Sequence, residues 1–128
     1  MSTDIRYEER ELVDGTVLTT LADELQGRDD LAVRFAAEFI ADLPVRCARM
    51  HAACGTGDRE ALLRVALSIR ASAHMVGAGL LAADAQALRL LALRAPMTEC
   101  AAQASVVERS ANESVVALIR VIAGFRHP

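Results

Sequence analysis

The chain has 128 residues, the size of a single domain. Hydrophobic residues make up 53 % of it, but only 3 % are aromatic and Trp is absent, so the core must be built from Ala, Leu, Val and Ile. This composition favours packed helices over a β-sandwich. The net charge of −3, from 14 basic and 17 acidic residues, argues against a nucleic-acid partner, because nucleic-acid binders usually carry a basic excess.

The sequence also argues against a membrane protein. It holds no run of about 18 uncharged apolar residues, and the N-terminal stretch MSTDIRYEERELVD has no hydrophobic signal-peptide core. We therefore expect a cytoplasmic protein whose Cys47, Cys54 and Cys100 are reduced and buried. We predict no metal and no cofactor, because the Cys and His spacings match no zinc-site pattern.

The first half of the chain predicts a polar N-terminal arm and two helices. Residues 1–13 are mostly polar and charged and form a frayed arm or a short helix. Residues 14–27 predict a short helix that Asp14 or Thr16 caps and Gly27 ends. Residues 29–55 predict a long helix, in which Pro44 removes one backbone hydrogen bond or introduces a kink. Its apolar stripe has spacings of four and three and consists of Leu31, Phe35, Phe39, Leu43, Cys47, Met50 and Cys54.

Three further helices follow, separated by short turns. The third runs from near Asp58 to near Gly77, the fourth covers residues 79–95 before Pro96, and the fifth is capped by Thr98. The stripe of the fifth helix is Val107, Ala111, Val115, Leu118, Ile122 and Phe125. Because short turns favour antiparallel neighbours, residues 14–128 predict an all-α, antiparallel up-and-down four-helix bundle with an additional short N-terminal helix.

The third helix has two distinct faces when each residue is rotated by about 100°. The predicted core face consists of Leu62, Val65, Ile69, Ser72, Ala73 and Val76. The predicted outward face consists of Leu63, Arg64, Leu67, Arg70, Ala71 and His74. Leu63 and Leu67 form a small apolar strip rimmed by two arginines, which is typical of a contact surface. The alternative is that the bundle or a dimer partner covers this face.

The segment Ala66–Ala78, read ALSIRASAHMVGA, resembles the core motif of the histidine-containing phosphotransfer (HPt) domain of two-component phosphorelays. That motif reads Ala-His-Ser-Leu-Lys-Gly-Ser-Ala, two variable positions, then Leu/Val-Gly-Ala. Identical residues are Ala66, Ser68, Ser72, Ala73, Gly77 and Ala78, and conservative ones are Ile69, Arg70 and Val76. The resemblance spans roughly residues 17–124. It implies a four-helix bundle whose exposed histidine exchanges a phosphoryl group with an aspartate of a receiver domain.

The chain departs from the HPt pattern at its chemical centre. Leu67 stands where the family has its phosphoacceptor histidine, Ala71 stands in place of a glycine, and Arg89 stands where the family often has Glu. Leucine has no lone pair and forms no phosphoramidate, so phosphotransfer through this position is excluded. Arg70 keeps the positive charge of the family's lysine and can fork onto phosphate or carboxylate. The resemblance therefore implies a pseudo-HPt domain that binds a response-regulator receiver domain or a histidine kinase without phosphotransfer.

Two other functions stay open. His74 lies seven residues after Leu67, about 20° around the helix and about 10 Å along it, so it points the same way. It is a surface residue, a binding contact or a relocated phosphoacceptor. The other alternative is a helical dimerisation or scaffold bundle, and the sequence leaves monomer and homodimer open. Because no other catalytic motif is present, we do not expect an ordinary enzyme.

Overall fold

The computed structural model describes residues 13–24 and 29–126. Those ranges contain five α-helices and no strand. The helices are α2 (Gly15–Glu24), α3 (Asp29–Thr56), α4 (Arg59–Met75), α5 (Gly79–Arg94) and α6 (Met97–Arg126). The predicted arm, apart from Val13, and the predicted helix end at Gly27 lie outside the described residues.

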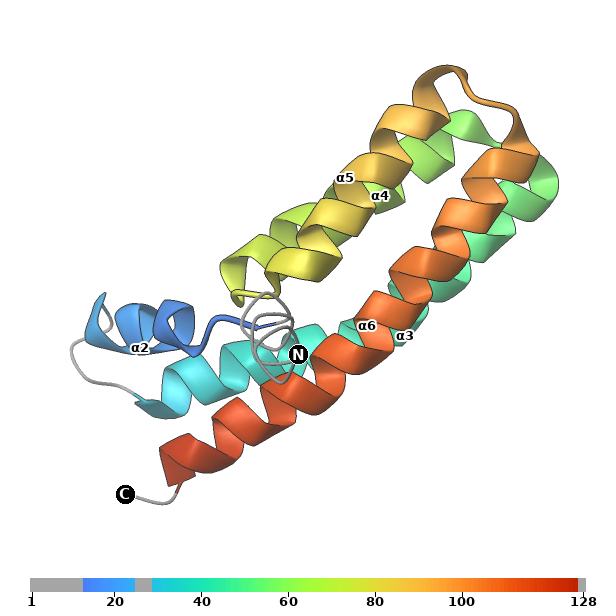
Figure 1. Cartoon of the computed structure of the whole chain (residues 1–128). Helices are drawn as coiled ribbons and strands as arrows, with labels where there is room; N and C mark the ends of the chain where they lie inside the picture. The colour runs from blue at the N-terminus through green and yellow to red at the C-terminus, as the bar shows by residue number, and fades with distance from the viewer. Residues whose placement is uncertain (1–12, 25–28, 127–128) are drawn as a thin grey trace, which may run out of the picture.

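The four long helices form the predicted bundle (Figure 1). The long helices α3 and α6 run side by side, and the α4–α5 hairpin packs along them, with α4 against α3 and α5 against α6. The short helix α2 packs against the first half of α3, beyond the end of the hairpin. The all-α, up-and-down architecture with a short N-terminal helix is therefore confirmed. Within the described residues, no helix is both long and apolar enough to cross a membrane.

Local side-chain hydrogen bonds mark two of the helix starts, those of α2 and α4. The Asp58 carboxylate accepts the Ala61 N–H at 3.0 Å and caps α4. Asp14 accepts the backbone N–H and the hydroxyl of Thr16, and these two bonds hold the pKa of its carboxyl below the ordinary value. The predicted cap at Thr98 is wrong. Helix α6 already begins at Met97, and the Glu99 and Cys100 N–H groups donate to the Pro96 carbonyl.

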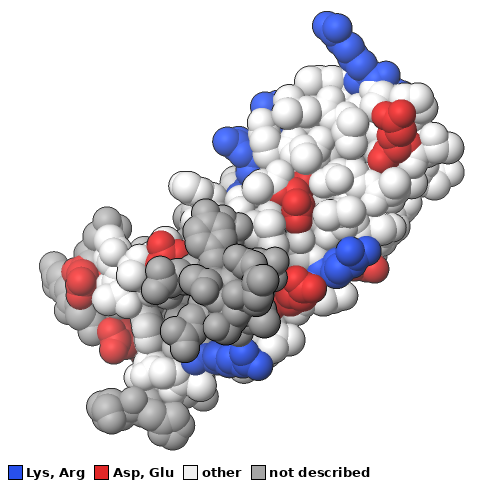
Figure 2. All heavy atoms as spheres, viewed as in Figure 1, with Lys and Arg blue, Asp and Glu red and all other residues white. Residues whose placement is uncertain are grey.

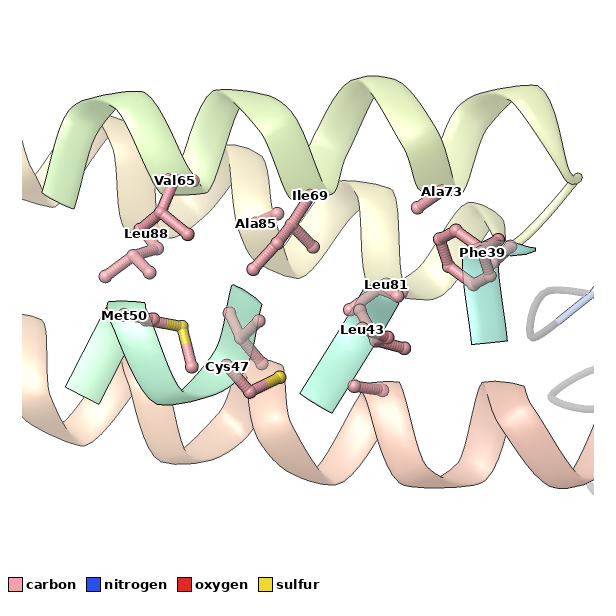
Figure 3. Packing of buried hydrophobic residues seen from close by; sticks show 14 of the residues in the cluster. Phe39, Leu43, Cys47, Met50, Val65, Ile69, Ala73, Leu81, Ala85 and Leu88 are labelled. Atoms are coloured by element: carbon pink, nitrogen blue, oxygen red, sulfur yellow. The ribbon is translucent and has the colours of Figure 1, made fainter. Parts of the chain in front are cut away.

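The core is built from aliphatic side chains of all four bundle helices, which converge between the helices in Figure 3. Five of the six residues predicted on the core face of the third helix are buried, namely Leu62, Val65, Ile69, Ala73 and Val76, whereas Ser72 is half-buried. Pro44 lies inside α3, which continues through it. The predicted α3 stripe holds in its centre, from Phe39 to Met50, whereas Ala32 and Ala36 are buried near its start and Cys54 is only half-buried. Cys47 and Cys100 are buried, and all three thiols are free.

Gly77 joins α4 to α5 and holds the start of α2. Its φ of +79° favours glycine, and a Cβ there would lie 2.5 Å from the Asp14 carbonyl oxygen. The Asp14 N–H donates to the Gly77 carbonyl at 2.7 Å. This contact brings Val13, which we assigned to the arm, into the core.

Candidate functional site

The outward face of α4 is the candidate site, and we call it the α4 face: Leu63, Arg64, Leu67, Arg70, Ala71 and His74. Five of the six side chains are exposed, and Leu67 at the centre is 47 % exposed. Leu63 differs from the prediction, because it is half-buried and packs against the core. Its position about 40° from Leu67 on the helix turns it toward the flank of α4. The exposed apolar strip along α4 is therefore narrower than the sequence suggested.

Helix α5 adds apolar surface beside the α4 face that the sequence reasoning missed. Leu90 and Leu93 are 54 % and 53 % exposed. Asp84 faces α6, since its carboxylate accepts the Ser110 hydroxyl. Leu93 lies nine residues later and therefore on the opposite side of the α5 axis, about 180° around the helix from Asp84. Leu93 thus lies on the α4 side of α5. A helical wheel of residues 79–94 would have identified both leucines as outward, but not which neighbour they flank.

Helix rise places these leucines at similar heights along the hairpin. Leu63 lies about 18 Å from the end of α4, while Leu90 and Leu93 lie about 17 and 21 Å from the start of α5. Leu67 lies one turn closer to the α4–α5 turn. The α4 face and the outer flank of α5 therefore form one continuous side of the bundle with a mainly apolar centre.

Helices α4 and α5, which carry this surface, are connected to each other at both ends. At one end the tight turn at Gly77 connects them. At the other end the Arg59 guanidinium donates to the carbonyl oxygens of Ala92 and Ala95, at 3.1 and 2.5 Å. These bonds satisfy carbonyl groups at the end of α5 that have no hydrogen-bond donor within the helix itself. The surface is therefore presented by a rigid helix pair.

A groove of about 460 Å³ lies on the other flank of α4, between α3 and α4. We call it the arginine groove. Its lining residues are Arg46, Arg49, Ala52, Ala53, Thr56, Asp58, Ala61, Arg64, Val65 and Ser68. Arg46 also donates to the Ser72 hydroxyl of α4. We predicted Ser72 on the core face, but it is only half-buried and makes this polar contact. Sequence reasoning missed Arg46 and Arg49, because only the packing of α3 on α4 brings them beside Arg64.

A second groove, of about 440 Å³, lies between α3 and α6 and contains His51. The His51 Nε2 and the Glu108 Oε2 are 2.8 Å apart, and both side chains are nearly half exposed. His51 is therefore a surface residue paired with Glu108. Burial and the nearby Glu108 carboxylate both raise the pKa of the Cys47 thiol, which disfavours the reactive thiolate.

The α4 face offers no nucleophile at its centre. His74 is exposed on it, but among residues 13–24 and 29–126 no carboxylate or other side chain hydrogen-bonds to it. A histidine used as a nucleophile or base is usually oriented by such a partner. In the described part of the chain, no three His, Cys, Asp or Glu side chains gather as they would around a metal ion.

An antiparallel helical bundle with this α4 face has the fold of histidine-containing phosphotransfer proteins. The crystal structure of histidine-containing phosphotransfer protein B from Pseudomonas aeruginosa PAO1 is similar to this chain, with a TM-score of 0.79 and 25 % sequence identity. The match covers 88 % of this chain and 95 % of that one. No family model and no curated protein matches the sequence.

Proposed function

We propose that the chain is a pseudo-HPt domain of a two-component phosphorelay, which docks through its α4 face and transfers no phosphoryl group at position 67. The observation that carries this proposal is Leu67. It lies, 47 % exposed, where the HPt motif has its phosphoacceptor, within a motif that otherwise matches except for Ala71 in place of glycine, and in a bundle similar to an HPt protein. A leucine conserves the outward position and removes the nitrogen that would hold phosphate.

The partner is a receiver domain or a histidine kinase, the proteins that HPt domains meet in phosphorelays. Desolvation of Leu67, Leu90 and Leu93 by a partner contributes a few kcal/mol at about 25 cal/mol per Å² of apolar area. Ordering of side chains and desolvation of polar groups oppose this term, so the area alone does not set the affinity. Arg70 adds attraction for an acidic pocket of a receiver domain, and that part weakens with salt.

Phosphotransfer through His74 is the second candidate. Its support is that His74 is exposed on the α4 face. Two features disfavour it. His74 is displaced from position 67 by about 10 Å along the helix, so a partner would have to shift by two turns. It also has no orienting partner among the described residues. The third candidate, a dimerisation bundle, requires Leu67 to be covered by a second copy.

The test is a pull-down of the host's receiver domains and histidine kinases with the wild type and with Leu67→Arg. We expect Leu67→Arg to abolish docking and to leave the thermal unfolding midpoint nearly unchanged, because the residue lies off the core face. Val116→Arg is the matched control, since Val116 is similarly exposed but on α6. It should dock normally. Unfolding of Leu67→Arg would overturn the proposal, because Leu67 would then be a core or dimer residue.

Incubation with a phosphorylated receiver domain tests the chemistry separately. The wild type should acquire no acid-labile phosphate, and Leu67→His should acquire it if only the nucleophile is missing. Ala71, in place of the smaller glycine, sets a limit on how closely a receiver approaches. Wild-type labelling that disappears in His74→Gln would establish His74 as the phosphoacceptor and refute the pseudo-HPt assignment.

A further inference from the structure

We infer that the arginine groove binds an acidic segment of the docked partner protein. This inference rests on the proposed function, because the groove adjoins the α4 face and shares Arg64 with it. It extends the docking surface from α4 onto α3 and assigns Arg46, Arg49 and Arg64 as carboxylate-binding residues.

The shape of the groove suits a short stretch of polypeptide. Along α3 it runs from Arg46 to Thr56, a span of ten residues or about 15 Å. An extended chain rises about 3.3 Å per residue, so the groove accommodates four or five residues. Its lining includes the small or apolar residues Ala52, Ala53, Ala61 and Val65. These short side chains allow a backbone to lie close to the helices while its charged side chains reach the arginines.

The charges of the groove favour carboxylates at one end. Arg46 and Arg49 are one turn apart on α3, and Arg64 lines the groove from α4. Arg49 has no hydrogen-bond or ion-pair partner among the described residues, and Arg64 has only the exposed Glu60 at 3.2 Å. At the opposite end, Asp58 is the acidic lining residue, but its carboxylate is already engaged as the cap of α4.

This concentration of positive charge stands out because the whole chain carries a net charge of −3. In the view of Figure 2, which looks onto α5 and α6, positive and negative side chains are scattered among uncharged atoms. Positive side chains gathered at one end of a groove focus the field on an occupant there. Guanidinium groups spaced along a groove match a row of carboxylates, each of which can accept two parallel hydrogen bonds.

The groove lies where a partner seated on Leu67 would reach it. Ser68 follows Leu67 directly and lines the groove, and Arg64 precedes Leu67 by three residues. The orientation of Arg46 is fixed by the Ser72 hydroxyl, one turn beyond Ser68. A partner that covers Leu67 therefore places its adjoining chain over Arg64 and Ser68 and onto the α3 arginines.

The inference is tested with a fluorescein-labelled hexaglutamate peptide and the full-length protein, by fluorescence anisotropy at low salt. We expect saturable binding that weakens with salt, and no binding of the matching hexaglutamine peptide. Arg49→Glu and Arg64→Glu should each weaken hexaglutamate binding about tenfold, because each reverses a charge that receives a carboxylate. Arg120→Glu is the matched control, an exposed arginine of α6 with the same change of net charge. It should change the affinity less than about twofold.

Amide chemical shifts locate the peptide on the molecule. Perturbations along residues 46–56 and 58–68 are expected. Equal loss of affinity in Arg49→Glu and Arg120→Glu, or perturbations centred on α6, would overturn the inference, because binding would then follow the overall charge. Displacement of the peptide by equimolar inorganic phosphate would also overturn it, in favour of a small-anion site. Leu67→Ser should bind the peptide as the wild type does, so failure of this inference and failure of docking are distinguishable.

Discussion

Replacement of Gly77 by alanine tests the contact that joins α2 to the hairpin. Two separate costs follow from the geometry. The φ of +79° strains any residue with a Cβ, which costs about 1–2 kcal/mol. The new methyl group would also lie 2.5 Å from the Asp14 carbonyl oxygen and 3.0 Å from the Val17 Cβ, so the start of α2 must move.

That movement breaks the 2.7 Å hydrogen bond between the Asp14 N–H and the Gly77 carbonyl, which costs about 0.5–1.5 kcal/mol. It also loosens Val13 and Leu18, both buried in the core. We therefore expect Gly77→Ala to lower the free energy of unfolding by at least about 2–3 kcal/mol. The measurement is urea denaturation followed by circular dichroism, with amide hydrogen exchange of α2 as a local probe.

Gly57→Ala is the matched control for this prediction. Gly57 has a similar φ of +70°, but a Cβ there would meet nothing within 4 Å. It incurs the backbone strain and the same entropic change in the unfolded chain without the collision. The difference between the two variants isolates the contact with α2 and should exceed about 1 kcal/mol. Equal destabilisation, with α2 amides no less protected in Gly77→Ala, would refute the argument that the turn holds α2.

The other predictions concern burial. Ile69→Ala should lower the free energy of unfolding by about 2–5 kcal/mol, because Ile69 is buried. Leu67→Ala, two residues away but half exposed, should lower it by less than about 1 kcal/mol. Similar losses of the two variants in denaturant titrations would contradict the assignment of the two faces. Burial raises the pKa of the Cys47 and Cys54 thiols above the ordinary value of 9.0, so the folded state favours the protonated forms. Their contribution to stability should be complete below about pH 8 and lost as the pH rises through 9.0 and the raised folded-state pKa values. The denaturation midpoint should therefore fall less above pH 9 in the double variant Cys47→Ala/Cys54→Ala than in the wild type. The chain has no lysine that would titrate in the same range. Parallel pH profiles of the two proteins would show that the thiols do not cause the loss of stability at high pH.

The proposed pseudo-HPt domain would have a definite physical role. It would present a surface like that of an HPt protein and so compete for the same face of a receiver or kinase. Because it forms no covalent intermediate, its effect depends only on its concentration and affinity, and it reverses on dissociation. The restoration experiment with Leu67→His measures how much of the transfer geometry the surface has kept.

The sequence by itself determined the elements of the fold and the outward direction of position 67. Apolar spacings of three and four, with Asp58 as a cap and Gly77 as a stop, predicted α4 and its buried residues. These signals are local, because helix periodicity and capping depend on residues within one or two turns. These local signals misplaced the start of α6, where the Pro96 carbonyl accepts the first helical hydrogen bonds and Thr98 does not act as the cap.

Only the tertiary structure decided what surrounds the α4 face. Leu63 proved half-buried because α4 packs against α5 on that flank, and Leu93 joins the surface because α5 lies alongside. Arg46 and Arg49 line the same groove as Arg64, although each lies at least 15 residues from Arg64 along the chain. Periodicity fixes the direction of a side chain relative to its own helix axis. Which neighbour it meets depends on how whole helices pack, and that is set by the sum of many contacts between residues far apart in the sequence.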